Sequence, residues 1–187
     1  MSIRPKDGTP RRRVMRMQGY DYSQPGMYFV TACTSRREML FGEVLDGKMR
    51  MNDAGQMVER VWAELPLHYA SAQTDAFIVM PNHVHGIIVL RRPAVVGAGL
   101  KPAPTRRHGL PEIMRGFKTF SVRCVNELRP TSGTVWQRGY YEHVIRRGEI
   151  LDCVRRYIAE NPARWAADRE NPLATDPGSE VPWTRLA

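Results

Sequence analysis

The chain has 187 residues, of which 42% are hydrophobic and 25% charged, and these values are ordinary for one globular domain with tails. It carries 28 Lys and Arg against 19 Asp and Glu, and this net charge of +9 either favours a polyanionic partner such as nucleic acid or serves solubility. Three scattered cysteines argue against a disulfide framework or a cysteine zinc site, and the absence of a long apolar stretch argues against a membrane span or secretory signal. We therefore expect a protein of the reducing cytoplasm.

Three regions follow from charge and polarity along the chain. Residues 1–16 predict a flexible basic arm, in which Arg11, Arg12 and Arg13 can lie along DNA phosphates or simply be solvated. Residues 17–166 predict the folded domain, interrupted at 92–109 by a long basic loop rich in proline and glycine. Residues 167–187 predict a polar, poorly ordered tail.

Hydrophobic periodicity and turn residues predict the elements of the folded domain. In chain order they are a strand over 27–34, a hairpin over 43–51 with its turn at Asp46-Gly47, a helix over 52–68, strands over 76–80 and 83–90, a helix over 110–128, a strand over 135–145 and a helix over 148–161. This order predicts an α+β sandwich, with one central antiparallel sheet and helices packed on one face. The strand over 83–90 is the most apolar, so we expect it to be central.

That strand carries two histidines. His83 and His85 are two residues apart, so a strand directs both imidazoles to the same face. Such a pair can hold a divalent cation if a third ligand comes from elsewhere, or the two side chains can simply face water.

The last helix offers a partner for the pair. Tyr157 and Asn161 are four residues apart and lie on one helix face, so the Asn oxygen is a plausible third ligand with the Tyr hydroxyl beside it. The spacing of Tyr157 from Ile150 and Val154 fits the edge of an apolar stripe equally well.

The segment from Trp136 to Ile145 mixes aromatic and basic residues. Aromatic rings next to Arg can stack on unpaired bases and neutralise phosphates, or Trp136 and Tyr141 can belong to the core of a last strand. The helix over 110–128 carries Arg115, Lys118 and Arg123, which can contact phosphates or form a solvated face. We assign Lys118, Arg138 and Tyr140 to DNA binding.

The motifs described above occur together in a recognisable pattern. The chain resembles the REP-associated tyrosine transposases, relatives of the single-strand insertion-sequence transposases, from about residue 14 to 166. The segments that carry the resemblance are Met80-Pro81-Asn82-His83-Val84-His85, Trp136-Gln137-Arg138-Gly139-Tyr140-Tyr141-Glu142-His143, Tyr157-Ile158-Ala159-Glu160-Asn161-Pro162, residues 19–26 and Phe117-Lys118.

The resemblance implies a ferredoxin-like HUH endonuclease core. His83 and His85 would then bind magnesium or manganese, Asn161 would complete the site, and Tyr157 would be the nucleophile. The implied substrate is single-stranded DNA with palindromic hairpins, cut and rejoined through a 5′-phosphotyrosine by a monomer or homodimer associated with the nucleoid.

Two other functions are compatible with parts of this pattern. A non-catalytic nucleic-acid-binding module would keep the basic surface, and Tyr140 and Tyr141 are rival nucleophiles to Tyr157. A zinc hydrolase would use the histidine pair, but the sequence has no His-Glu-x-x-His pattern to favour it.

Overall fold

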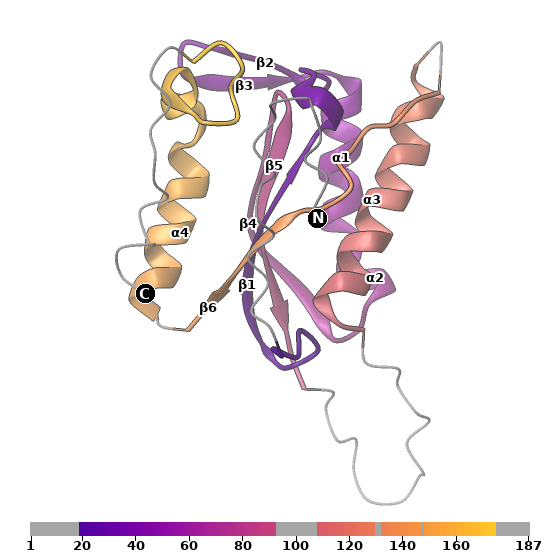
Figure 1. Ribbon diagram of the computed structural model, residues 1–187, viewed down its shortest axis with the longest axis vertical. Coiled ribbons are helices and arrows are strands. Elements are labelled where there is room, and N and C mark those ends of the chain that lie inside the picture. The colour runs from indigo at the N-terminus through magenta and orange to yellow at the C-terminus, as the bar shows by residue number, and fades with distance from the viewer. Residues whose placement is uncertain (1–18, 93–107, 130–131, 147, 175–187) are drawn as a thin grey trace, which may run out of the picture.

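A four-stranded antiparallel sheet lies between two layers of helices in the computed structural model (Figure 1). The structure describes residues 19–92, 108–129, 132–146 and 148–174. Its elements are β1 (Gly26–Cys33), the 3₁₀-helix η1 (Ser35–Arg37), β2 (Gly42–Leu45), β3 (Lys48–Met51), α1 (Asp53–Ala63), α2 (Leu65–His68), β4 (Ala72–Met80), β5 (His83–Leu90), α3 (Leu110–Glu127), β6 (Tyr141–Ile145), α4 (Gly148–Glu160) and the 3₁₀-helix η2 (Pro162–Ala167).

The strand order in the main sheet is β4-β5-β1-β6, and each neighbouring pair is antiparallel. Because α1 and α2 connect β1 to β4 and α3 connects β5 to β6, the core follows the β-α-β-β-α-β order of a ferredoxin-like sandwich. The predicted fold class is therefore confirmed, and the histidine strand β5 is central as predicted. Strands β2 and β3 form the predicted separate hairpin, with positive φ at Asp46 and Gly47.

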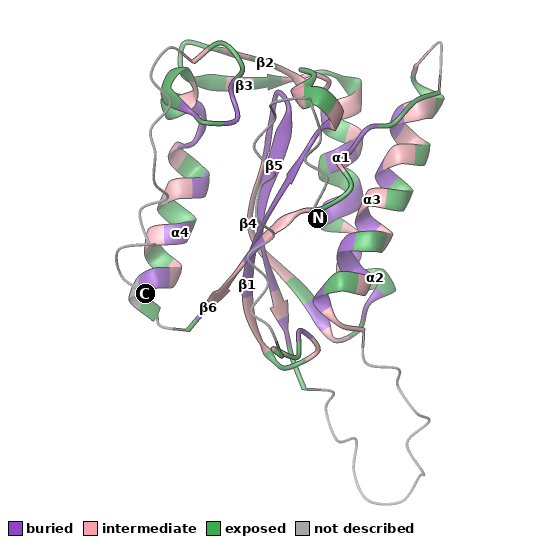
Figure 2. Ribbon diagram, viewed as in Figure 1, coloured by how far each residue is buried: buried purple, intermediate pink, exposed green. Residues whose placement is uncertain are grey.

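The helices cover both faces of the sheet, whereas the sequence analysis placed them on one. Tyr28 and Val30 of β1 join the core under α1 and α3, while Phe29 between them joins a second core under α4. Strands β1 and β5 are buried at almost every position, so both of their faces are covered (Figure 2). Helix α4 supplies the second cover with Ile150, Val154 and Ile158.

Three predicted elements have different lengths in the structure. The helix expected over 52–68 is split into α1 and α2, because Pro66 lacks an N–H and its ring excludes a continuous helix. Strand β4 begins at Ala72 and contains an irregularity between Thr74 and Phe77. Only 141–145 of the expected last strand forms β6, and Trp136 makes an isolated bridge to Thr34 instead.

The expected basic arm and most of the expected basic loop lie outside the described residues, so Arg11, Arg12 and Arg13 have no structural assignment. The chain beyond residue 166 differs from the expected tail as far as it is described, since Asp168, Glu170 and Asn171 are buried. Within the described ranges, no helix is long and apolar enough to cross a membrane.

The close packing of α1 on the sheet depends on a glycine in β5. The rings of Trp62 and Phe77 stack with centroids 4.4 Å apart, and a Cβ on Gly86 would lie 2.8 Å from Phe77 and closer still to Trp62. Gly86→Ala is expected to lower the free energy of unfolding in urea by about 1–3 kcal/mol. The matched control is Gly148→Ala, whose Cβ meets nothing within 4 Å. Equal losses in the two variants would contradict this packing.

Candidate active site

His83 and His85 face each other on the α4 side of β5, as the strand alternation predicts. Both are buried, with 0% and 3% of their surfaces exposed, and their Nε2 atoms are 3.0 Å apart. Two nitrogen lone pairs at that distance repel unless a proton or a metal ion lies between them. Because both side chains are buried, the alternative that they face water is wrong. The pair is an enclosed site with two nitrogen atoms that can act as metal ligands.

The second nitrogen of each ring is held by a neighbouring side chain. Asn82 donates from Nδ2 to the Glu170 carbonyl at 2.6 Å and to the Arg37 carbonyl at 3.3 Å, which fixes the orientation of its amide. Its Oδ1 consequently accepts from His83 Nδ1 at 2.9 Å, so Nε2 of His83 carries a lone pair. Thr31 Oγ1 lies 2.8 Å from His85 Nδ1 and orients that ring. Such second contacts are typical of metal-binding histidines.

Two oxygen-bearing side chains beyond α4 contribute to the site, Asn161 directly after the helix and Asp168 after η2. A carboxylate oxygen of Asp168 and one nitrogen from each histidine all lie within 4.8 Å of one another, so these three residues can hold a metal ion. Asn161 is 1% exposed and donates from Nδ2 to Asp168 Oδ2 at 3.2 Å. Among the described residues its Oδ1 has no hydrogen-bond partner, although it is buried. Two imidazoles, a carboxylate and an unsatisfied amide oxygen suit a divalent cation.

Tyr157 lies one helical turn before Asn161, as the sequence spacing predicts. Its hydroxyl is 3.5 Å from His85 Nε2, and its ring meets the rings of Phe29 and His85 at steep angles. Burial, followed by the charges of Asp168 and Glu170, raises the pKa of Tyr157 well above its usual value. The phenol is therefore protonated at neutral pH in the absence of a nearby cation.

Residues 168–171 are anchored to the domain by the buried carboxylate of Glu170. Glu170 is 2% exposed and forms an ion pair with Arg37 at 3.2 Å, and it accepts a hydrogen bond from the Cys33 thiol at 3.3 Å. Asp168 accepts from the Glu170 backbone N–H at 2.6 Å. These contacts hold Asp168 next to the histidines.

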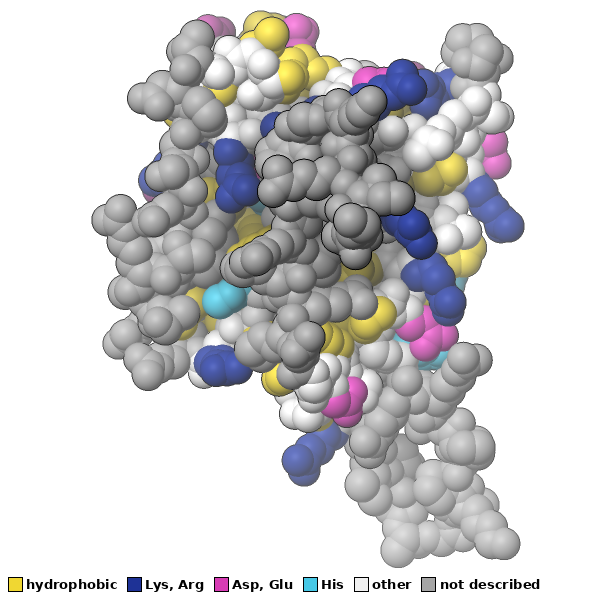
Figure 3. Space-filling model, in the orientation of Figure 1, with side chains coloured by type: hydrophobic (Ala, Val, Ile, Leu, Met, Phe, Trp, Pro, Cys, Tyr) yellow, Lys and Arg dark blue, Asp and Glu magenta, His cyan; other side chains and the backbone are white. Residues whose placement is uncertain are grey.

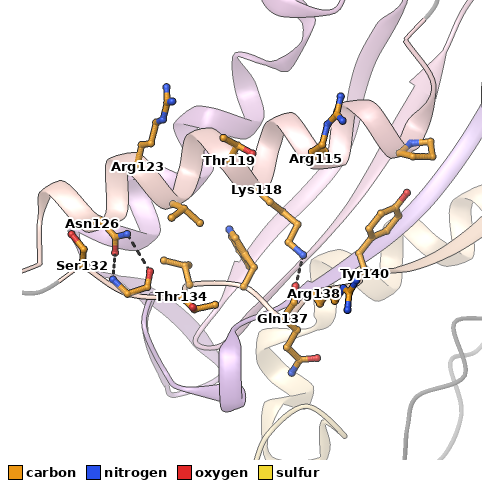
Figure 4. A pocket seen from close by; sticks show the side chains of 15 residues that line it. Arg115, Lys118, Thr119, Arg123, Asn126, Ser132, Thr134, Gln137, Arg138 and Tyr140 are labelled. Atoms are coloured by element: carbon orange, nitrogen blue, oxygen red, sulfur yellow. Dashed lines mark hydrogen bonds between the residues drawn. The ribbon is translucent and has the colours of Figure 1, made fainter.

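The residues assigned to DNA binding lie elsewhere. Lys118, Arg138 and Tyr140 line a groove between α3 and residues 132–140 (Figure 4). Lys118 donates to the backbone carbonyls of Gln137 and Gly139. An ammonium group has three donors, so these two bonds do not exhaust it. Burial lowers the pKa of Lys118 to about 8.

Sequence reasoning missed Asp168, Glu170 and the orienting residues Asn82 and Thr31. Asp168 follows Asn161 by seven residues across Pro162, so no helical or strand period connects the two. The one signal was Trp165, since a large aromatic residue in an otherwise polar segment often packs against the domain.

Comparison with known proteins agrees with this fold. No family model matches the sequence. A solved structure described as a REP-associated tyrosine transposase bound to a REP hairpin superposes with a TM-score of 0.56 at 20% identity, covering 81% of this chain and 74% of that one. A candidate transposase from Deinococcus radiodurans R1 matches at 17% identity and a TM-score of 0.45, over 77% of this chain and 95% of that one.

The chain therefore has the fold of REP-associated tyrosine transposases, which confirms the resemblance seen in the sequence at the level of the fold. It is also 34% identical over 178 residues to an uncharacterized protein of Haemophilus influenzae Rd, and the match covers 90% of this chain and 98% of that protein. The chain belongs to the same family as this protein.

Occupation of the site by a metal ion should stabilise the fold. Mn²⁺ at about 100 times its Kd is expected to add about 2.7 kcal/mol to the free energy of unfolding, measured as a shift in Tm. His83→Ala and Asp168→Asn should lose most of this shift. The Tm shifts of Asn161→Ala and Asp168→Asn, compared with each other, identify the stronger oxygen ligand. Asp46→Asn, in an exposed turn, is the matched control. A full shift in His83→Ala would rule out this site.

Lys118 should make stability depend on pH in a defined direction. Its pKa is about 8 in the folded chain against 10.5 unfolded, so between these values the unfolded state binds more protons. The folded state therefore gains stability as pH rises from about 8 to 10.5, and the gain is lost as pH falls through 8. The urea midpoint of the wild type should rise over this window relative to Lys118→Met. A constant difference between the two proteins would contradict the shift.

Proposed function

We propose that this protein is a metal-dependent transposase and endonuclease for single-stranded DNA, which cuts and rejoins strands beside palindromic hairpins through a 5′-phosphotyrosine. The observation that carries the proposal is the Tyr157 hydroxyl, 3.5 Å from His85 Nε2 at the edge of a site that can hold a cation. A nucleophile beside a Lewis acid is the arrangement that phosphodiester cleavage by a phenol requires.

In the proposed reaction Tyr157 is the attacking group. Its oxygen forms a bond to the scissile phosphorus while the bond from phosphorus to the 3′ oxygen breaks. The phenol loses its proton and the departing 3′ oxygen gains one, so the products are a 5′-phosphotyrosine and a free 3′-hydroxyl. Attack by a 3′-hydroxyl on this link reverses the step and rejoins the strand without ATP.

His83, His85 and an oxygen from Asp168 or Asn161 would hold magnesium or manganese. When bound, the ion polarises the phosphate and favours the ionised phenol. Phe29 and His85 fix the ring of Tyr157, and Asn82 and Thr31 fix the histidines, so the site needs little rearrangement before reaction.

All proposed site residues come from one chain. Tyr157 reaches the histidine pair of the same molecule, and this supports a site completed within a monomer rather than by a helix exchanged between two copies. The basic composition supports a DNA partner, and the fold relative that is described as bound to a REP hairpin supports hairpins as the particular substrate. Such a substrate would associate the protein with the nucleoid.

The test is covalent capture of DNA. The protein is incubated with Mn²⁺ and a hairpin oligonucleotide labelled at its 5′ or 3′ end, and the products are separated in denaturant. A labelled adduct is expected only with the 3′ label, and it should disappear with a chelator and in Tyr157→Phe. Tyr140→Phe and Tyr141→Phe are the matched controls and should keep the adduct.

The contrary results point to the alternatives. An adduct that survives in Tyr157→Phe would remove the proposed nucleophile and favour Tyr140 or Tyr141. Tight binding without an adduct on a broad set of hairpins would favour the non-catalytic binding module.

A further inference from the structure

We infer that the groove between α3 and residues 132–140 binds an unpaired stretch of nucleic acid and leads it around the edge strand β6 toward Tyr157. The inference rests on the proposed function for its substrate, but the groove has its own geometry and its own test. It lies on the opposite face of the sheet from the histidine pair.

The groove has a volume of about 960 Å³ and two distinct walls. Exposed residues of α3 form one wall, and an extended segment before β6 forms the other (Figure 4). Asn126 closes one end by a pair of 3.1 Å hydrogen bonds with the backbone of Gly133, and Lys118 ties Gln137 and Gly139 to α3 near the other end. The walls are therefore fixed to each other.

The lining is basic. It includes Arg115, Lys118, Arg123 and Arg138, and among the described residues that line the groove there is no Asp or Glu. Lys and Arg side chains also gather over α3 in the space-filling view (Figure 3). Arg115 and Arg123 are eight residues apart on one helix, or about 12 Å along its axis, so they can meet different phosphates of one strand.

The arginines are available to a ligand. Arg115 is 75% exposed, and its ion pair with Glu112 at 3.8 Å is a surface pair that a phosphate can displace at little cost. Arg123 and Arg138 are also exposed. Phosphate contacts of this kind dominate the affinity of nucleic-acid binding.

The same groove offers a surface for bases. The half-buried ring of Tyr140 lines it, together with the hydroxyls of Thr119, Ser132 and Thr134. Aromatic rings stack on unpaired bases, whereas the bases of a duplex are already stacked on one another. The combination of a ring inside the groove with arginines on its rim therefore favours a single strand over a duplex.

The groove and the candidate active site lie on opposite faces of the sheet, and the edge strand β6 connects the two faces. Tyr140 packs against the core on the α3 side, and the next residue, Tyr141, packs against the core on the α4 side that also contains Tyr157. Strand β6 is at the edge of the sheet (Figure 1), so a strand bound in the groove can pass around it without crossing the sheet. The backbone N–H of Gln137, in the wall of the groove, donates a hydrogen bond to the carbonyl of Cys33. Cys33 lies opposite His83 in the register of β1 and β5.

The test compares binding of two probes by fluorescence anisotropy with full-length protein. The probes are a labelled oligothymidylate, which is unpaired throughout, and a blunt duplex of the same length. Tyr140→Ala should weaken oligothymidylate binding by about 5-fold to 100-fold, while Tyr140→Phe, which keeps the ring, should bind as the wild type does.

The double variant Arg115→Ala/Arg123→Ala tests the phosphate contacts. It should reduce the slope of log affinity against log salt by about 1.4, because each lost phosphate contact accounts for about 0.7 on a single strand. The matched control is the double variant Arg50→Ala/Arg60→Ala, at exposed arginines of β3 and α1 outside the groove, which lowers the net charge by the same amount. Circular dichroism of each variant checks that the fold is retained.

The outcomes separate this inference from the proposed function. Loss of oligothymidylate binding in the groove variants with unchanged duplex binding supports the groove, even if no hairpin gives a Tyr157 adduct. Wild-type binding of oligothymidylate by folded groove variants overturns the inference, even if the adduct forms. Equal losses on both probes also overturn it, because they assign the groove to duplex DNA.

Discussion

The candidate active site depends on two imidazoles that face each other in a buried position. Strand alternation directs His83 and His85 to one face of β5, and their Nε2 atoms are 3.0 Å apart. Asn82 leaves the His83 nitrogen with a lone pair, so the pair is stable only with a cation or a shared proton between the rings. The two-residue spacing of the histidines thus produces a site that favours binding of a cation.

Helix α4, which covers the second face of the sheet, supplies the hydroxyl group of the candidate site. Helix α4 covers Phe29 and Ile87 with its apolar side and, on the same side, brings Tyr157 to His85. Asn161, directly after the helix, contacts Asp168 of the same site. The burial that positions the Tyr157 phenol also raises its pKa, which opposes ionisation. The same environment that holds the proposed nucleophile in place therefore makes ionisation of its phenol depend on a nearby cation.

Local patterns were enough to predict most of the fold and the centre of the site. Three of these patterns depend only on neighbours in sequence: the apolar content of 83–90, the Asp46-Gly47 turn and the spacing from Tyr157 to Asn161. The structure contains the predicted strand, hairpin and helix at these positions. The second helical layer was missed because an apolar strand indicates burial on both faces without identifying what covers each one. Asp168 and Glu170 were missed because their burial depends on Arg37, Cys33 and Asn82, all far away in sequence.

Peptide mapping by mass spectrometry, on protein trapped with a hairpin oligonucleotide and digested with nuclease and protease, identifies the attacking residue directly. Attack by Tyr157 predicts a nucleotide phosphate attached to the peptide that contains Tyr157. Attachment to Tyr140 or Tyr141 instead, or the absence of any nucleotide-bearing peptide from a sample that has cut the DNA, would contradict it.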